Sequence, residues 1–395
     1  MELINKIKEL SINNFEDVRK IRRHLHKYPE LSFQEDKTSE YIISCLEELE
    51  IPYKNNVAGR GIVGWIEGEN PEGHVVALRA DMDALPIQEE NEIEYRSVNN
   101  NCMHACGHDV HTACLIGAAR ILKKIKSEIR GKVLFVFQPA EELLPGGAKQ
   151  MLLDSIFNEH KPDIFIGQHV DPELECGTTG FREGVYMASA DEIYITIRGV
   201  GGHAAMPKHR TNNLLIASKI IIGLNDMLEK STYLPSSTIL AFGKIEAKGT
   251  TNIIPQEVMI DGTFRILDEK FRYRFHKDII NKAEQIAREM GAECYVDIKK
   301  GYPVLENDKI ISAKSSKLAG EYLGKENVKD LDIRMTAEDF SYFSQKYPSV
   351  FYRLGTGNAE KNIICGLHNQ NFNIDEEALK TGMGLFAYLA VSHCR

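Results

Sequence analysis

The segment NNCMHACGHDVHTA holds the densest group of side chains that could bind a metal ion. Its cysteines, histidines and aspartate are Cys102, His104, Cys106, His108, Asp109 and His111. Cys106 and His108 are two residues apart, so in an extended segment both side chains face the same side. A thiolate and an imidazole suit zinc or another late first-row divalent ion. A closed zinc knuckle is the alternative, but it needs four ligands in paired spacing, and no matching CxxC or HxxxH follows.

A pair of glutamates, Glu141 and Glu142, closes the apolar segment KVLFVF in the motif QPAEE. Two adjacent carboxylates cannot both turn to one side of a regular strand, but the end of a strand can present both to one site. One glutamate could then bind a metal ion while its neighbour transfers protons. The alternative is a solvated acidic loop, the usual environment of a Glu-Glu pair.

Other polar residues also follow apolar segments of the strand type. His169 ends DIFIGQHV, Asp81 and Asp83 end ALRADMD, and His368 lies in CGLHNQN near the C-terminus. Each alone is explained as well by a hydrogen-bonded histidine or a plain turn. Because open α/β sheets bind ligands at the carboxyl ends of their strands, we expect Asp81, Asp83, Glu141, Glu142 and His169 at one edge of a sheet.

The pattern of apolar residues predicts the helices and strands that carry these side chains. Residues 4–49 have a helical pattern interrupted at Pro29, and strand-like segments follow at 61–68, 74–81, 132–142 and 163–170. Residues 111–126 have apolar residues three and four apart, which predicts a helix. Strands that are apolar throughout and alternate with helices predict an α/β domain whose mixed sheet is flanked by helices on both faces.

A second unit begins near Val185. The pattern of residues 185–300 predicts strands and helices in the order β-α-β-β-α-β. This order is the ferredoxin-like split unit, which has one four-stranded sheet and two helices. After Gly301 the pattern resumes helices and strands that would complete the first domain. We therefore expect a catalytic domain of residues 1–184 and 301–395, with residues 185–300 inserted as a lid or dimerisation domain.

Composition limits the classes of protein to consider. A chain of 395 residues is longer than one hydrophobic core usually organises. Its net charge of −9 argues against a nucleic-acid partner. No apolar run of about 18 residues occurs, so we expect no membrane span. The charged N-terminus does not resemble a signal peptide, and the eight scattered cysteines fit reduced thiols or metal ligands, so we expect a cytoplasmic protein.

Taken together, the motifs resemble a known family. ALRADMDALPI, MHACGHDVHTA, QPAEE with GGA, GQHV, GVGGHAAMP, NIIP, GTFR, TAEDFSYF and GLHN are similar, in matching order, to successive signatures of the N-acyl-amino-acid amidohydrolases. This group includes hippurate hydrolases and indole-acetyl-amino-acid hydrolases, within the aminoacylase and carboxypeptidase class of metallopeptidases. The resemblance runs from about Arg22 to about Asn373.

The resemblance implies a metal centre of two divalent ions, which could be zinc, manganese, cobalt or nickel. It implies that Cys106 bridges the ions, with four further ligands: His108, Glu142, His169 and His368. Glu141 would be the general base, taking a proton from the metal-activated water and passing it to the leaving amine. Asp83 would orient a histidine ligand.

The resemblance also implies roles for the inserted domain. His203, in GGHAAMP, would stabilise the oxyanion from the partner subunit of a homodimer. Asn252 and Arg265 would hold the free carboxylate of the substrate, for which a planar guanidinium is well suited. Where the wider class has a histidine ligand this chain has Asp81, a feature that the amidohydrolase branch shares. The roles of Asp81 and of His209 are left open.

The expected function is metal-dependent hydrolysis of the amide bond of N-acyl amino acids or small peptides. Within the same class, an N-acetyl-diaminopimelate deacetylase, a dipeptidase or a carboxypeptidase are alternatives. A hydrolase with Cys106 as nucleophile is a more remote alternative, and so is a non-catalytic protein that binds metal. Alkylation of Cys106 with and without chelator distinguishes a ligated thiolate from a nucleophile.

Overall fold

The computed structural model describes residues 2–235 and 237–395, and this part of the chain divides into two compact units. Unit 1 comprises Met1–Val185, Glu306–Asp332 and Asp339–Arg395, and unit 2 comprises Tyr186–Leu305 and Ile333–Glu338. The expected first domain was 1–184 and 301–395, and unit 2 differs from this division because it extends to Leu305 and includes residues 333–338. Their place has a backbone cause, because Arg334 exchanges hydrogen bonds with Tyr186 and Ala188 at the start of unit 2.

A mixed sheet forms the centre of unit 1, and in the described residues its strand order is β1-β2-β4-β3-β5-β16-β6-β15. The strands are β1 (Tyr53–Val57), β2 (Gly61–Glu67), β3 (Asn70–Asp81), β4 (Arg130–Gln138), β5 (Ile164–Glu175), β6 (Thr179–Phe181), β15 (Val328–Asp330) and β16 (Ser349–Gly357). The central strands β4, β3, β5 and β16 run parallel to one another. Their carboxyl ends therefore meet at one edge of the sheet.

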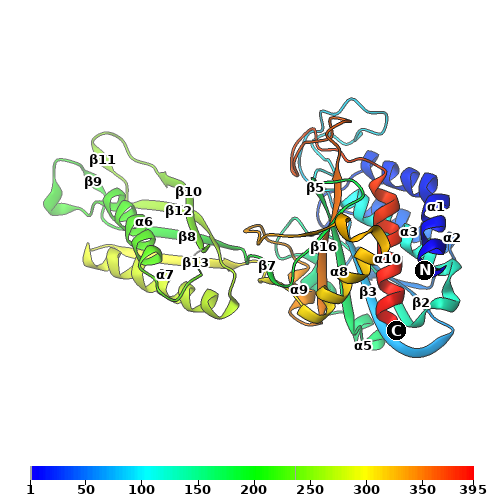
Figure 1. Cartoon of the computed structure of the whole chain (residues 1–395). Coiled ribbons are helices and arrows are strands. Elements are labelled where there is room, and N and C mark those ends of the chain that lie inside the picture. The colour runs from blue at the N-terminus through cyan, green and yellow to red at the C-terminus, as the bar shows by residue number, and fades with distance from the viewer. Residues whose placement is uncertain (1, 236) are drawn as a thin grey trace. The chain divides into compact units, whose positions relative to one another are not determined.

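The helices of unit 1 lie around this sheet (Figure 1). They are α1 (Glu2–Lys27), α2 (Asp36–Glu48), α3 (His108–Lys124), α4 (Gly147–Met151), α5 (Ile156–His160), α8 (Lys309–Leu323), α9 (Ser341–Ser344) and α10 (Ala378–Cys394), with 3-10 turns at Lys126–Glu128 and Lys325–Asn327. Every residue of β16 is buried, as is β3 from Val76 onward. Because burial does not alternate along these strands, both faces of the sheet are covered.

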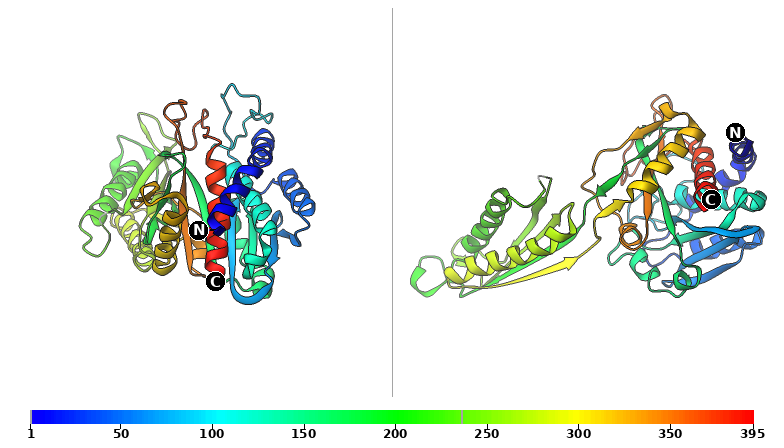
Figure 2. Two further views of the ribbon diagram at one scale, coloured as in Figure 1. Left: turned by 45° about the vertical axis from the view of Figure 1, so that its right-hand side comes forward. Right: turned by 60° about the horizontal axis from the view of Figure 1, so that its bottom comes forward.

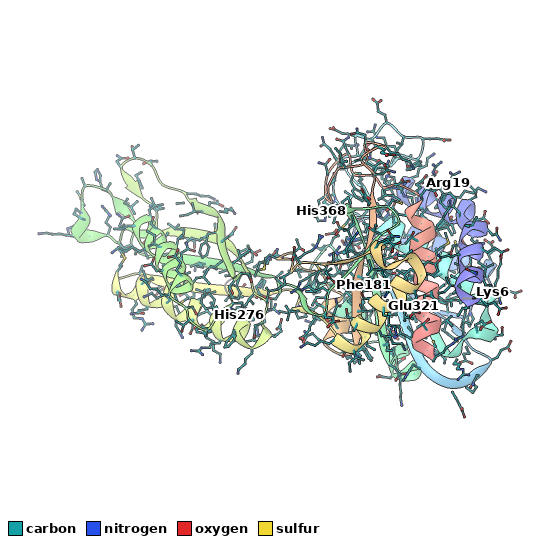
Figure 3. The ribbon with its side chains drawn as sticks, viewed as in Figure 1. Lys6, Arg19, Phe181, His276, Glu321 and His368 are labelled. Atoms are coloured by element: carbon teal, nitrogen blue, oxygen red, sulfur yellow. The ribbon has the colours of Figure 1, made fainter. Side chains whose placement is uncertain are left out.

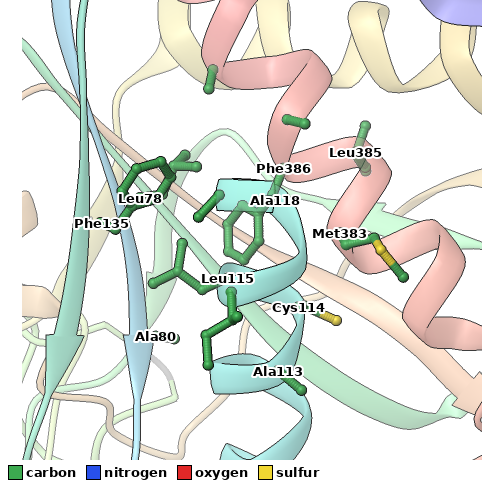
Figure 4. Close-up of a cluster of buried hydrophobic side chains, with 14 of the residues drawn as sticks. Leu78, Ala80, Ala113, Cys114, Leu115, Ala118, Phe135, Met383, Leu385 and Phe386 are labelled. Atoms are coloured by element: carbon green, nitrogen blue, oxygen red, sulfur yellow. The ribbon is translucent and has the colours of Figure 1, made fainter. Parts of the chain in front are cut away.

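The core of unit 1 lies where α3 and α10 pack on the central strands. Leu78 of β3 and Phe135 of β4 meet Leu115 of α3 and Phe386 of α10 in one buried cluster (Figure 4). Helix α10 also packs against α1, and the two lie side by side in both further views (Figure 2). Helices from both ends of the chain, α1 and α10, thus pack in the same hydrophobic core as the central strands.

Unit 2 has its own sheet and core. Its elements are β8 (Asp191–Arg198), β9 (Gly202–His203), a 3-10 turn at Pro207–His209, α6 (Asn213–Glu229), β10 (Ile239–Ala247), β11 (Ile253–Ile254), β12 (Glu257–Arg265), α7 (Glu269–Glu289) and β13 (Glu293–Lys300). The sheet order is β10-β12-β8-β13, and all neighbours are antiparallel. Burial alternates along β8, whose Ile193, Ile195 and Ile197 pack in the core of this unit. The remaining short strands are β7 (Gly184–Met187) and β14 (Leu305–Asn307).

The predicted fold class is confirmed: an α/β domain with a mixed sheet flanked by helices is interrupted by a ferredoxin-like β-α-β-β-α-β unit. The helix predicted at 111–126 begins earlier, at His108, so a candidate metal ligand opens α3. Among the described residues, no helix is both long and apolar enough to cross a membrane.

Candidate metal centre

The strand register brings polar side chains together at the carboxyl edge of the unit 1 sheet. Asp81 is paired with Gln138 across β3 and β4, and Arg79 is paired with Gly167 of β5. His169 lies two residues beyond Gly167, so it stands at the level of Asp81. Glu141 and Glu142 come soon after the end of β4. The predicted placement of these residues at one edge is therefore seen in the structure.

A short segment before α3 carries Cys106 and His108 to this edge. Gly107 between them adopts φ 80°, in the left-handed region that favours glycine. A side chain is also excluded here, because a Cβ on Gly107 would lie 2.5 Å from Cγ2 of Val170. The backbone thus passes so close to β5 that Cys106 lies beside His169, with 3.5 Å between Sγ and Nε2.

Two buried histidines are oriented through their Nδ1 atoms. Nδ1 of His108 lies 2.8 Å from the carbonyl oxygen of Asp83 and 3.1 Å from its Oδ1. Nδ1 of His169 lies 2.8 Å from the carbonyl oxygen of Val170. Since a carbonyl oxygen only accepts, each Nδ1 carries a proton and donates it, which leaves Nε2 as the ring atom that can bind a metal ion. This is the usual arrangement of histidines that bind metal through Nε2.

The loop after β4 and the loop after β16 complete the cluster. The backbone N–H of Glu142 donates to Oδ2 of Asp83 at 3.0 Å, and Oε1 of Glu142 lies 3.3 Å from Nε2 of His368. His368 has φ 60°, and its N–H donates to the carbonyl oxygen of Ala105 at 2.8 Å. Its side chain is half exposed and lies in the loops beyond the ends of β5 and β16 (Figure 3).

The candidate ligand atoms form two groups that share one residue. Those of Cys106, His108 and His169 lie within 4.8 Å of one another, and so do those of Cys106, Glu142 and His368. A third group of the same size joins His108 with Glu141 and Glu142. Each of the five candidate ligands and the candidate base therefore belongs to one compact cluster.

Unsatisfied atoms in this cluster fit divalent cations. Nε2 of His108 and Oε1 of Glu142 are buried and make no hydrogen bond of good geometry, although Oε1 lies 3.3 Å from Nε2 of His368. Leaving such atoms unpaired is costly, and a cation bound by both would remove that cost. Thiolate, imidazole and carboxylate together suit zinc and neighbouring first-row ions.

The negative charges of the cluster also favour binding of a cation. Burial and the charges of Glu142, Glu141 and Asp81 raise the pKa of the Cys106 thiol well above its usual value. Burial alone would lower the pKa of His108, but Asp81, Asp83 and Glu142 raise it to about 10. Burial, followed by the charge of Arg353, lowers the pKa of His169. The carboxylates thus hold protons on Cys106 and His108 that a bound cation would displace.

Asp81, whose role the sequence left open, is occupied by other partners. Its Oδ2 accepts from Arg79 at 2.7 Å, and its Oδ1 accepts from Nδ1 of His111. His111 in turn accepts the N–H of Val170 at its Nε2, 2.9 Å away, so both of its ring nitrogens are used. Asp81 and His111 therefore support β5 next to His169. A histidine in place of Asp81 would leave the buried cation of Arg79 without this partner.

The candidate residues of unit 2 lie in two places. His203 of β9 is exposed and faces Ile253 of β11, and the N–H of Ala204 donates to the carbonyl oxygen of Asn252. Arg265 ends β12 at the opposite end from Asn252, and β12 has nine residues, which span about 30 Å. The structure brings His203 and Asn252 together but places Arg265 apart from them. His209 lies in the 3-10 turn after β9 and is exposed.

Several residues that support the cluster were not singled out from the sequence. Ser32 donates to Oδ2 of Asp83 at 2.6 Å, and Glu35 accepts the N–H of Ala140 at 2.7 Å. Asp339 accepts from Arg79 and from Gln138. These contacts join segments that are far apart in the chain. Only the resemblance of TAEDFSYF pointed to the neighbourhood of Asp339.

Known proteins share this fold and these motifs. Over residues 77–392 the chain matches the profile of peptidase family M20/M25/M40. It is 36% identical over 379 residues to IAA-amino acid hydrolase ILR1-like 4 of Arabidopsis thaliana, covering 94% of this chain and 84% of that protein. It is 37% identical over 362 residues to the N-acetyl-L-cysteine deacetylase of Bacillus subtilis (strain 168), covering 91% of this chain and 84% of that protein.

A solved structure has the same fold as this chain. The YXEP protein of Bacillus subtilis, described as a dinuclear metal binding peptidase from the M20 family, aligns with a TM-score of 0.83. It is 33% identical, and the alignment covers 96% of this chain and 97% of that chain. Fold and donor cluster together define a metal-dependent enzyme that hydrolyses amide bonds. The chain belongs to peptidase family M20/M25/M40, in its amidohydrolase branch.

Proposed function

We propose that this enzyme removes the acyl group from N-acyl amino acids, with a centre of two divalent ions. The ligands are Cys106, His108, Glu142, His169 and His368. The observation that carries the proposal is the pair of donor groups that share Cys106, with Glu141 beside His108 and Glu142. Two relatives act on such substrates by name, one on N-acetyl-L-cysteine and one on conjugates of amino acids with IAA. Zinc, manganese, cobalt and nickel all suit this donor set.

When bound, a pair of divalent ions lowers the pKa of water and polarises a carbonyl group. Within the protein, Glu141 is the proposed general base. It is buried, and its Oε1 lies 3.4 Å from the N–H of Asp339, which limits the positions that the carboxylate can take. From there Glu141 would take a proton from the attacking water and deliver it to the leaving amine. Asp83 keeps the proton of His108 on Nδ1 and thereby leaves Nε2 as a ligand.

The proposed substrate contacts in unit 2 require two subunits. His203 would stabilise the oxyanion, and Asn252 and Arg265 would hold the substrate carboxylate. Because Arg265 ends β12 and Asn252 lies before the start of that strand, one carboxylate can reach both only if they come from different chains. A homodimer through unit 2 is therefore part of the proposal. Apolar side chains on α6 and on the edge strand β10 are exposed, as a dimer interface requires: Leu215, Ile222, Ile239 and Ile245.

The alternative in which Cys106 is the nucleophile has little physical support. Reactive cysteines lie in electropositive surroundings that lower the pKa of the thiol. Burial and three neighbouring carboxylates act in the opposite direction on Cys106. Dipeptidase, carboxypeptidase and N-acetyl-diaminopimelate deacetylase activity use the same centre and differ only in substrate, so the assay must include their substrates.

The test is hydrolysis of N-acetyl and N-benzoyl amino acids, dipeptides and N-acetyl-diaminopimelate before and after removal of metal. We expect chelation to abolish activity and added divalent ions to restore it. Glu141→Gln should lower kcat about 10²–10⁴-fold while the metal content stays unchanged, because only the proton transfer is lost. Glu40→Gln, an exposed position on α2, is the matched control. Full activity of the stripped enzyme, or of Glu141→Gln, would refute the proposal.

A further inference from the structure

The loop that carries Glu141 and Glu142 contains a backbone conformation that its residue does not favour. Ala140, directly before Glu141, has φ 52°. A residue with a Cβ pays a steric penalty in this left-handed region, so the surrounding structure must hold it there. The direction in which Glu141 and Glu142 leave the strand depends on this residue, because it sets the turn between Pro139 and the glutamate pair.

Both backbone groups of Ala140 are held by hydrogen bonds. Its N–H donates to Oε1 of Glu35 at 2.7 Å, and its carbonyl oxygen accepts from the N–H of Gly147 at 2.9 Å. The bond to Gly147 closes the loop on itself. The bond to Glu35 is therefore the one that ties the left-handed residue to another part of the fold.

Glu35 lies in an environment where burying a carboxyl group costs free energy. Its side chain is wholly buried, and Oε2 has no hydrogen-bond partner. Burial, followed by the charge of Asp83, raises the pKa of Glu35 to about 7. An apolar residue would suit this interior better if packing were the only requirement.

The turn that bears Glu35 also touches the other side of the cluster. Leu31 pairs with Ala84, and the hydroxyl of Ser32 donates to Oδ2 of Asp83. The same Oδ2 accepts the N–H of Glu142 at 3.0 Å. Residues 31–35 thus contact the glutamate loop at Ala140 and, through Asp83, at Glu142.

We propose that Glu35 is a positioning residue for the hydrolytic reaction: by accepting the N–H of Ala140 it holds the left-handed turn that presents Glu141 and Glu142 to the donor cluster. This inference rests on the proposed function, because it needs Glu141 as the base. Glu35 does not itself touch substrate or metal. Its effect is expected on kcat, since a base displaced by about 1 Å can slow a reaction about 10²-fold.

Three substitutions of Glu35 separate the hydrogen bond from charge and packing. Glu35→Gln keeps an oxygen acceptor at the same reach, so kcat should stay near that of the wild-type enzyme. Glu35→Leu fills the same space without an acceptor, and kcat should fall about 10²-fold with KM little changed. Glu35→Asp keeps the charge but withdraws the oxygen by one methylene, and it should resemble Glu35→Leu. If Glu35→Leu does not fold, the order of Gln above Asp decides the question.

Two further variants make the outcomes distinguishable. Glu30→Gln is the matched control, because Glu30 lies in the same segment and caps α2 through Thr38 without contacting the glutamate loop. Its kcat should equal that of the wild type. Glu141→Gln, measured in parallel on the metal-loaded dimer, reports on the proposed function alone. A slow Glu141→Gln enzyme with fully active Glu35→Leu and Glu35→Asp enzymes overturns only this inference, as does a Glu35→Gln enzyme as slow as Glu35→Leu.

Discussion

Asp83 illustrates how much of this site depends on one carboxylate. Its two oxygens accept from His108, from the N–H of Glu142 and from Ser32. Burial would raise its pKa, but these hydrogen bonds and the charge of His108 lower it, so the group stays ionised. The family resemblance implies that Asp83 orients a histidine ligand, and the structure adds a contact with the glutamate loop.

Asp83→Asn is expected to weaken metal binding about 10–100-fold, the usual cost of losing a partner that orients a ligand. The amide can no longer accept on both sides, so either His108 or the N–H of Glu142 loses its acceptor. Competition with a chromophoric chelator measures the metal affinity. Asp17→Asn, at an exposed position on α1, serves as the control. An unchanged affinity in Asp83→Asn would show that His108 is oriented by the carbonyl oxygen alone.

At the scale of elements, the packing of α10 on unit 1 includes one buried polar contact. Nε2 of His393 in α10 lies 2.8 Å from the hydroxyl of Ser315 in α8, and Nδ1 has no hydrogen-bond partner. Burial, followed by the charges of Lys314 and His74, lowers the pKa of His393 from 6.5 to about 4. The folded chain therefore keeps this histidine neutral.

The lowered pKa of His393 predicts a specific loss of stability in acid. Between pH about 4 and 6.5 the unfolded chain binds a proton here that the folded chain does not, so this contribution to the free energy of unfolding is present above pH 6.5 and is lost as pH falls to about 4. At about 1.4 kcal/mol per pH unit, the loss amounts to roughly 3 kcal/mol.

Denaturant unfolding of the wild type and of His393→Gln at several pH values measures this contribution. The difference in unfolding free energy between the two proteins should shrink as pH falls through the window, because glutamine does not titrate. Parallel curves for both proteins from pH 7 to pH 4 would contradict the assignment.

At the scale of the whole molecule, the proposed assembly follows from the way unit 2 exposes apolar groups. Ile222 of α6 is 61% exposed, and Leu215, seven residues earlier on the same helix face, is 45% exposed. Strand β10 is at the edge of its sheet and is thus able to pair with another chain. An isolated ferredoxin-like unit gains no stability from this exposed apolar surface, whereas the proposed dimer would bury it.

If unit 2 forms the proposed dimer, Ile222→Asp is expected to convert it into monomers, as measured by sedimentation equilibrium. Activity should fall with it, because His203 and Asn252 would no longer be supplied to the partner. Ile310→Asp on α8 of unit 1 is the control, since Ile310 is 78% exposed and lies outside the proposed interface. A fully active monomeric Ile222→Asp would contradict the role of the partner's lid residues.

Most of the helices and central strands, the α/β class with its inserted unit and the types of the candidate ligands could be predicted from the amino-acid sequence. These features depend on local pattern: apolar periodicity, turns, and motifs whose residues are neighbours in the chain. The expected domain boundary differs from the compact units at residues 301–305 and 333–338, and the place of 333–338 is set by backbone pairing of Arg334 with Tyr186 and Ala188 rather than by any local signal.

Which polar residues share a hydrogen bond could not be predicted from the sequence, because the packed fold sets their partners. The sequence leaves the role of Asp81 undecided, and its hydrogen bonds with Arg79 and His111 are visible only in the structure. No sequence motif points to Glu35. Glu35 and Ala140 are 105 residues apart, and no periodicity connects them. Such contacts arise because burial forces each polar group to find a partner wherever the packed elements bring one. Because the partners are neighbours in space and not in sequence, the local sequence pattern cannot predict them.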